Sequence, residues 1–230
     1  MFTENYREVS QRIAAAARRA GSSPDKITLV AVSKGRSVAE VKGAIDAGIA
    51  DLGENRLQEA QLKYNAIRSM QQATPLRWHM IGHLQTNKAK DAVGIFDLIH
   101  SVDSLRLAEE IDKQAARIGK VQDILIEVKT SPEESKYGIA PQDLAKLLSQ
   151  VRALQNLRLK GLMTIAPLAD DPQKARPYFK MLKDLFDTAN TQLTIDHRLS
   201  TLSMGMTDDF EAAIEEGATM VRLGRALFEG

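Results

Sequence analysis

The sequence predicts an α/β protein built as one (β/α)8 barrel, or TIM barrel, with an extra helix at its N-terminus. Eight short apolar runs of β type alternate with helical stripes along the 230 residues. This alternation requires a parallel sheet, because each crossover returns the chain to the same edge, and eight such units fit a closed barrel of this length. An open doubly wound sheet is the alternative, but no G-x-G-x-x-G motif follows the first predicted strand.

The first predicted element is a helix that precedes the barrel. Its apolar residues recur at helical spacing and are Phe2, Tyr6, Val9, Ile13 and Ala17. Gly21 follows them at the position where helices commonly end. Since no strand precedes this helix, it has no place among the strand–helix units, and we expect it to cap or flank the barrel.

Eight strands are predicted from short apolar runs. They span Ile27–Val32, Ala50–Gly53, Arg77–Ile81, Leu98–Val102, Ile124–Val128, Leu157–Met163, Thr201–Met204 and Met220–Leu223. Helical stripes fill most of the intervals, over about residues 37–47, 57–67, 105–118, 144–151 and 178–186, and another stripe begins at Phe210. No linker or change of composition interrupts the chain, so we expect a single domain over residues 1–230.

The composition limits the classes of function. The 31 Lys and Arg residues balance 30 Asp and Glu residues to a net charge of +1, which argues against a nucleic-acid binder. The absence of cysteine excludes disulfides, thiol nucleophiles and zinc–thiolate sites. No apolar run approaches the ~18 residues of a membrane span, and the N-terminal segment is not typical of a signal peptide. We therefore expect a cytoplasmic protein that binds neither nucleic acid nor membranes.

Lys34 is a candidate for covalent chemistry at the mouth of the barrel. Functional side chains of β/α barrels lie at the C-terminal ends of the strands, and Lys34 follows the first strand in phase with Val30 and Val32. In a partly dry mouth, desolvation and the cations Arg36 and Arg222 are expected to lower the lysine pKa and release a neutral, imine-forming amine. A solvated loop lysine is the competing interpretation.

The seventh strand ends in groups suited to an anion. Ser203, Gly205 and Thr207 precede a predicted helix, whose N-terminus would present backbone N–H groups to a phosphate. The alternative is that Thr207 and Asp208 only cap this helix.

The eighth strand places Arg222 and Gly224 on one face. An arginine inside a barrel needs an acceptor, and Gly224 lets a ligand approach the backbone closely. Because strands one and eight are neighbours in a closed barrel, Lys34 and Ser203 are expected to converge with these two residues. An amine, an anion site and a buried arginine suit a phosphorylated aldehyde.

The chain resembles the pyridoxal 5′-phosphate homeostasis proteins over essentially its whole length. Seven segments in the same order carry the resemblance: Val30–Lys34, Gly53–Glu59, Trp78–Lys88, Glu133–Gly138, Gly161–Met163, Leu202–Met206 and Val221–Gly224. The resemblance implies a fold type III barrel like the N-terminal half of alanine racemase, without the C-terminal β domain of those enzymes. It also implies that pyridoxal 5′-phosphate (PLP) is held as a Schiff base on Lys34.

The resemblance implies roles for five further residues. Arg222 would face the pyridine nitrogen of PLP, and Asn55 would line the ring. Ser203 would hold the phosphate together with the backbone near Gly224 and Arg225. The family commonly has Thr or Ser after the glycine, where this chain has Arg225. We therefore expect the amide or the side chain of Arg225 to take over that phosphate contact.

Binding is expected rather than catalysis. An arginine keeps the pyridine nitrogen unprotonated, which weakens PLP as an electron sink, and the second base of a racemase comes from the absent β domain. We expect a monomeric carrier that holds PLP and releases or delivers it, with PLP-dependent apo-enzymes as transient partners. The alternatives are a PLP-dependent amino-acid racemase, a lysine-imine aldolase, or a barrel that serves only as a protein-interaction scaffold.

The four histidines, His79, His83, His100 and His197, are weak candidates for metal ligands. No carboxylate completes a ligand set with them, so no metal is expected. His83 is instead a candidate for lining the PLP pocket. Lys136, in a polar loop after the fifth strand, is a candidate for handing PLP on, against the alternative of a solvated loop lysine.

Overall fold

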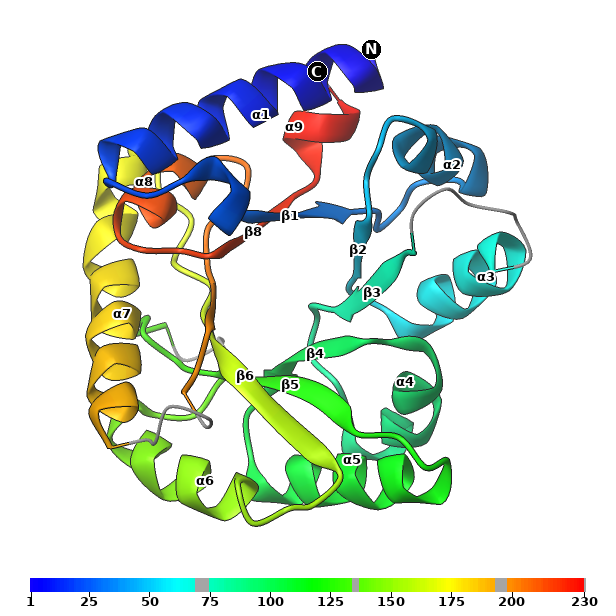
Figure 1. The fold of residues 1–230 in the computed structure, drawn as a ribbon, viewed down its shortest axis with the longest axis vertical. Coiled ribbons are helices and arrows are strands. Elements are labelled where there is room, and N and C mark those ends of the chain that lie inside the picture. The colour runs from blue at the N-terminus through cyan, green and yellow to red at the C-terminus, as the bar shows by residue number, and fades with distance from the viewer. Residues whose placement is uncertain (69–74, 134–136, 193–197, 230) are drawn as a thin grey trace.

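The computed structural model describes residues 1–68, 75–133, 137–192 and 198–229, and it shows a closed barrel of parallel strands (Figure 1). The strands are β1 (Thr28–Val32), β2 (Asp51–Glu54), β3 (Arg77–Met80), β4 (Leu98–Val102), β5 (Gln122–Glu127), β6 (Leu157–Met163), β7 (Thr201–Ser203) and β8 (Met220–Leu223). They pair in chain order, and β1 closes the barrel on β8. The predicted fold and strands are confirmed, and the strand ends differ from the prediction by at most two residues.

Helices surround this barrel on the outside (Figure 1). They are α1 (Phe2–Arg19), α2 (Val38–Asp46), α3 (Leu57–Ile67), α4 (Ala89–Ile95), α5 (Leu105–Arg117), α6 (Leu144–Val151), α7 (Arg176–Thr191), α8 (Phe210–Glu215) and α9 (Arg225–Phe228), with short 3-10 helices η1 (Pro24–Lys26), η2 (Thr86–Lys88), η3 (Pro141–Asp143) and η4 (Pro172–Ala175). The sequence did not predict α4 and α9, because seven and four residues show too little periodicity. Within the described residues, no helix combines the length and apolar character needed to cross a lipid bilayer.

The extra helix α1 packs beside α8 and α9, at the seam where β1 meets β8 (Figure 1). Its buried face includes Ala16 and Ala17, which have no exposed surface. Arg12 forms an ion pair with Glu211 of α8, with 3.2 Å between Nη2 and Oε2. The expectation that this helix flanks the barrel is therefore confirmed.

Two apolar clusters build the core. The larger one lies between the sheet and the helices, as expected where helices cover a parallel sheet. A smaller cluster brings together Val30, Leu98, Leu125, Met163 and Met220, which come from five different strands and therefore fill the barrel interior. Val30 lies in register with Arg222 on β8, so the arginine points inward as well. The pairing of β1 with β8 thus places a cation directly below the end of β1.

A close approach between two loops shapes the mouth of the barrel. Gly82, just after β3, lies so near Asn55, just after β2, that a Cβ atom at Gly82 would be 2.3 Å from the Asn55 carbonyl oxygen and 2.8 Å from its Cα. Only glycine fits there without displacing backbone. The position of Asn55 at the mouth therefore depends on Gly82.

Gly82→Ala is expected to lower the free energy of unfolding by about 1–3 kcal/mol, because the added methyl group forces the two loops apart. The matched control is Gly43→Ala in the exposed middle of α2, where a Cβ would have no neighbour within 4 Å. That change should stabilise the protein by about 0.5–1 kcal/mol, the difference in helix propensity. Urea unfolding of both variants measures this, and equal stabilities would contradict the close approach.

Candidate functional site

A pocket of about 270 Å³ opens at the carboxyl ends of the strands. Its wall consists of Val32, Lys34, Asn55, Ile81, Ile165, Leu168, Met206, Thr207, Asp208, Arg222, Gly224 and Arg225. Five of the six site residues expected from the sequence line this pocket, and Ser203 does not. The wall combines apolar side chains with one amine, two guanidiniums and one carboxylate, a mixture typical of a site for a charged small molecule.

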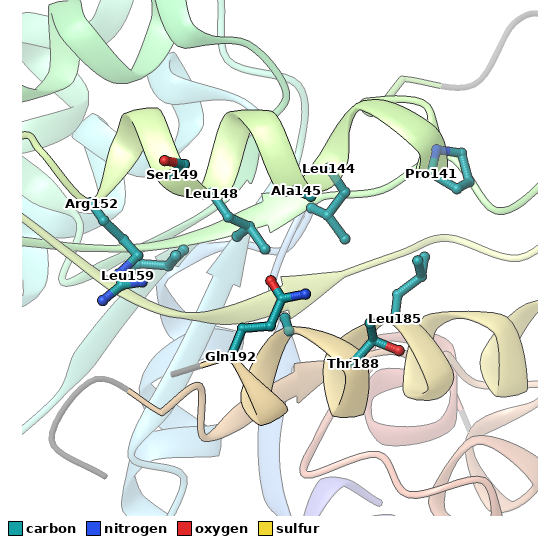
Figure 2. Close-up of a pocket in the computed structure, with 11 residues that line it drawn as sticks. Pro141, Leu144, Ala145, Leu148, Ser149, Arg152, Leu159, Leu185, Thr188 and Gln192 are labelled. Carbon is teal, nitrogen blue, oxygen red and sulfur yellow. The ribbon is translucent and has the colours of Figure 1, made fainter. Parts of the chain in front are cut away.

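A second cavity of about 260 Å³ lies on the outside of the barrel (Figure 2). Figure 2 shows side chains of α6 and α7 on its two sides, among them Leu148 and Leu185, with Leu159 of β6 near Arg152. Its wall is mostly aliphatic, and among the described residues that line it Arg152 is the one with a charge. Because it lies away from the carboxyl ends of the strands, where barrel sites are built, we do not assign the chemistry to it.

Lys34 reaches the pocket from the turn after β1, and its side chain is exposed. This corrects the expectation of a partly dry setting for the amine. Arg36 does not stand beside the amine either, because its guanidinium pairs with Glu229 and lies 5.3 Å from the centre of the Phe228 ring. The cations that share the pocket wall with Lys34 are Arg222, in β8, and Arg225, just after it.

A buried ion pair holds the backbone just before Lys34. Lys63 of α3 places Nζ 2.6 Å from Oε1 of Glu54, and the same Nζ donates to the carbonyl oxygen of Ser33 at 2.5 Å. The Ser33 hydroxyl donates to Glu54 as well, at 2.5 Å. Burial raises the pKa of Glu54, while the bonds from Lys63 and Ser33 act to lower it. The turn that carries the amine is therefore held to α3 by buried hydrogen bonds of Lys63.

Glu59 holds the other side of the same turn. Its Oε2 accepts from the backbone N–H of Gly35 at 2.9 Å, and Gly35 has φ of 71°, a left-handed conformation that favours glycine. Sequence reasoning did not assign roles to Glu54, Glu59 and Lys63. The signal was present, because both glutamates lie in the Gly53–Glu59 segment that carries the family resemblance.

Arg222 is buried and hydrogen-bonded. It is 3% exposed, and it donates through Nη1 to the Ser203 hydroxyl at 2.6 Å and through Nη2 to the Thr164 carbonyl at 2.9 Å. Burial lowers the pKa of Arg222 to about 10, although Glu127 and Asp209 act to raise it. The guanidinium is therefore still a cation at neutral pH, with N–H groups left over to face the pocket.

Ser203 lies beneath the pocket, which corrects its expected place. Its side chain has no exposed surface, and its hydroxyl is engaged by Arg222 and, at 3.0 Å, by Nδ1 of His100. Ser203 shares the inward direction of Arg222 but lies deeper, so the arginine separates it from the mouth. The hydroxyl that does line the pocket belongs to Thr207, which follows Ser203 in the segment that the sequence predicted to suit an anion.

Thr207 and Arg225 face each other where the ends of β7 and β8 meet. The Thr207 hydroxyl accepts from the backbone N–H of Ala226 at 3.4 Å, which joins the two loops. The side chain of Arg225 is exposed and pairs with Asp208 at the rim. The Asp208 carboxylate is thereby balanced, so its charge does not stand alone beside an anion in the pocket.

Asn55 supplies an unused acceptor. Its Oδ1 is buried, and within the described part of the chain it has no hydrogen-bond partner. Buried polar atoms are seldom left unpaired in native proteins. Asn55 also lines the pocket, so this unpaired acceptor lies in its wall.

The histidines occupy different parts of the barrel. His79 and His100 are buried in its interior, whereas His83 stacks on Tyr137 with 3.8 Å between ring centres and does not line the pocket. Among the described ranges, no group of three potential metal ligands comes together. Lys136 and His197 lie outside the described residues, so their expected roles stay predictions.

Comparison with known proteins gives consistent matches over the whole chain. A model of the alanine racemase N-terminal domain matches residues 5–230. A pyridoxal phosphate homeostasis protein of Aquifex aeolicus is 42% identical, over 98% of this chain and 96% of its own. The protein of the same description from Escherichia coli K12 is 40% identical, over 99% of this chain and 95% of its own.

Solved structures agree with the observed fold. PipY of Synechococcus elongatus, determined with PLP bound, is 38% identical and superimposes with a TM-score of 0.83 over 96% of this chain and 99% of its own. Alanine racemase of Clostridium difficile, at 18% identity, has a TM-score of 0.71 over 97% of this chain and 56% of its own. At that identity the racemase supports the fold alone.

Lys63→Met is expected to lower the free energy of unfolding by about 3–5 kcal/mol, because it leaves Glu54 buried without its partner. Combining it with Glu54→Met should restore most of the loss, since apolar residues of similar volume can replace a buried pair. Lys113→Met is the control, because Lys113 pairs with Glu110 on the exposed face of α5; it should change stability by less than about 0.5 kcal/mol. A double variant no more stable than Lys63→Met would contradict the buried pair.

His100 should make the fold sensitive to mild acid. Burial, with smaller contributions from His79 and Arg222, holds the pKa of His100 well below its ordinary value of 6.5. Below pH 6.5 the unfolded chain therefore binds a proton at this histidine that the folded chain does not bind. The free energy of unfolding then falls by up to about 1.4 kcal/mol for each unit by which the pH is lowered. Urea unfolding from pH 7.5 to 5.0 should show this slope reduced in His100→Asn. Identical slopes would contradict it.

Proposed function

The chain belongs to the family of pyridoxal phosphate homeostasis proteins, which share the alanine racemase N-terminal domain, and we propose on this premise that it binds PLP reversibly through Lys34 and acts in PLP homeostasis. The observation that carries the proposal is the meeting of Lys34 and Arg222 in one pocket, where β1 closes on β8. In this proposal the chain acts over residues 1–230 as one PLP-binding domain.

The groups of the pocket fit the parts of PLP. An aldehyde requires an amine, and Lys34 supplies it; bond formation between its Nζ and the aldehyde carbon releases one water and needs the neutral amine. Val32, Ile81 and Ile165 offer apolar surface to the ring, and Asn55 lies in the same wall with an oxygen that has no partner among the described residues.

The phosphate is assigned to the loops after β7 and β8. The Thr207 hydroxyl and the backbone of Gly224 and Arg225 line this side of the pocket. We propose Thr207 in place of Ser203 as the hydroxyl that contacts the phosphate, because the Ser203 oxygen is buried under Arg222. The side chain of Arg225 balances Asp208 at the rim, so we propose that its contact with the phosphate is made by its backbone N–H.

The same pocket is poorly equipped for catalysis. When bound, PLP supplies an electron sink whose strength depends on a protonated ring nitrogen. Arg222 is a cation and a hydrogen-bond donor, so it disfavours that proton. Among the described wall residues, Asp208 is the one carboxylate, and Arg225 pairs with it. We therefore propose that the protein holds PLP without substantial turnover of amino acids.

The exposed position of Lys34 supports release. Hydrolysis of the bond between lysine and PLP consumes water, and an exposed amine gives water access to that bond. We propose that PLP-dependent apo-enzymes receive the released PLP through transient encounters, and that the carrier is a monomer working in the cytoplasm.

Incubation with PLP should give the wild-type protein a visible absorption band that persists through gel filtration. Borohydride should then fix the cofactor to the peptide that contains Lys34, as peptide mass mapping would show. Lys34→Ala should lose the band, and Lys42→Ala, at an exposed ion pair with Asp46 on α2, should keep it. A colourless wild type, or a label on another lysine, would overturn the proposal, and brisk racemisation or cleavage of amino acids by the loaded protein would overturn its carrier role.

A further inference from the structure

A chain of buried polar side chains crosses the interior of the barrel from one end to the other. It starts at Asp51, at the beginning of β2, whose Oδ1 lies 2.8 Å from Nε2 of His79. Nδ1 of His79 lies 2.9 Å from Nε2 of His100, and Nδ1 of His100 lies 3.0 Å from the Ser203 hydroxyl. Ser203 then accepts from Arg222, which lines the pocket.

The members of this chain have very little exposed surface. His100 and Ser203 are 0% exposed, His79 is 2%, Arg222 is 3% and Asp51 is 6%. Hydrogen bonds in such an environment are stronger than in water, and a missing partner is correspondingly unfavourable. Four side chains from four different strands therefore form one hydrogen-bonded series that ends at the guanidinium. Apolar side chains would be enough to fill the barrel, so this polar series needs another explanation.

The donors and acceptors of these side chains allow one donor-to-acceptor direction along the hydrogen-bond chain in which every proton has an acceptor. The carboxylate of Asp51 only accepts, so His79 carries a proton on Nε2. With its Nδ1 free to accept, His79 takes the Nε2 proton of His100, and Nδ1 of His100 then takes the Ser203 proton. The Ser203 oxygen is left to accept from Arg222.

The opposite direction leaves one proton without an acceptor. It would require both His79 nitrogens to be protonated, and His100 would then donate to Ser203 through Nδ1. The Ser203 oxygen would accept from His100 and from Arg222 together. Within the described residues the hydroxyl has no third partner to take its own proton.

Charges at the two ends favour the same direction. Asp51 is an anion, since the bonds from His79 and Arg77 lower its pKa against the opposing effect of burial, and Arg77 also pairs with it at 2.9 Å. Arg222 at the other end is a cation, which Glu127 and Asp209 also face. Each hydrogen bond along the chain therefore points from the cation toward the anion.

We propose that Asp51, His79, His100 and Ser203 are positioning residues that act as one directed hydrogen-bond chain to hold the guanidinium of Arg222 toward the ring of bound PLP. The proposal rests on the proposed function, because it assigns a purpose to this orientation of Arg222. In this arrangement Ser203 offers Arg222 only a lone pair. The guanidinium is held from below, and its remaining N–H groups point into the pocket.

Nitrogen-15 NMR of the PLP-free wild type tests the direction without any ligand or variant. The protein has 4 histidines, so few imidazole signals need to be assigned. We expect His79 and His100 each to show a protonated Nε2 and an unprotonated Nδ1 at neutral pH. A protonated Nδ1 on His100 would overturn the proposal. Failure of the wild type to bind PLP would refute the proposed function but would leave this measurement unaffected.

Asp51→Asn tests the transmission to the pocket, because Asp51 lies at the far end of the barrel and does not line the PLP site. The amide can donate to His79 and so removes the fixed direction. We expect the His100 signals to change, the bound PLP absorption band to shift, and PLP affinity to fall about tenfold, as for the loss of one charge-assisted hydrogen bond.

The matched control is Asp123→Asn. Asp123 also lies near the start of a strand and pairs with an exposed arginine, Arg158, but it is not a member of the hydrogen-bond chain. It should leave the His100 signals and PLP binding as in the wild type. Unchanged His100 signals in Asp51→Asn, or equal changes in both variants, would overturn the proposal. If Asp51→Asn does not fold, the wild-type tautomers still decide it.

Discussion

The buried guanidinium of Arg222 is the constraint on which the site depends. Such a charge is stable inside a barrel only where acceptors meet its N–H groups, and the ends of β7 and β6 supply them through the Ser203 hydroxyl and the Thr164 carbonyl. Because β8 closes on β1, the same cation also lies in register with Val30, below the turn that carries Lys34. Closure of the barrel thus serves both the packing of the interior and the recognition of the ligand.

Lys34 combines a rigid backbone with a reachable side chain. The turn around it is held by Lys63 at the Ser33 carbonyl and by Glu59 at the Gly35 amide, while the amine itself is exposed. An enzyme of this chemistry gains from excluding water around the reacting bond. A carrier needs the reverse, since water must return to the bond for the aldehyde to leave. The braced turn with an open amine is consistent with storage and release.

The periodicity of the sequence was sufficient for most of the fold, because eight strand patterns alternate with helical stripes in most intervals and chain order settles the pairing in a closed barrel. It missed α4 and α9, which are too short to show a period. For the site, the end of each strand was the right place to look, and Lys34, Asn55, Arg222, Gly224 and Arg225 all line one pocket. The setting of the amine was predicted wrongly, because the path of Arg36 toward Glu229 depends on where the C-terminal helix packs.

What the sequence determined by itself was the alternation of elements, and with it the barrel and the strand ends that carry chemistry. How deep each side chain lies along the barrel axis was decided only by the tertiary structure. Ser203 and Thr207 both follow the seventh strand pattern, yet Ser203 lies under Arg222 and Thr207 lines the pocket. The hydrogen-bond chain from Asp51 to Ser203 was also not visible in the sequence, because its first and last members lie 152 positions apart and its members meet through hydrogen bonds between strands. Alternation along one strand shows which way a side chain points, and only the packing of all strands shows what it meets there.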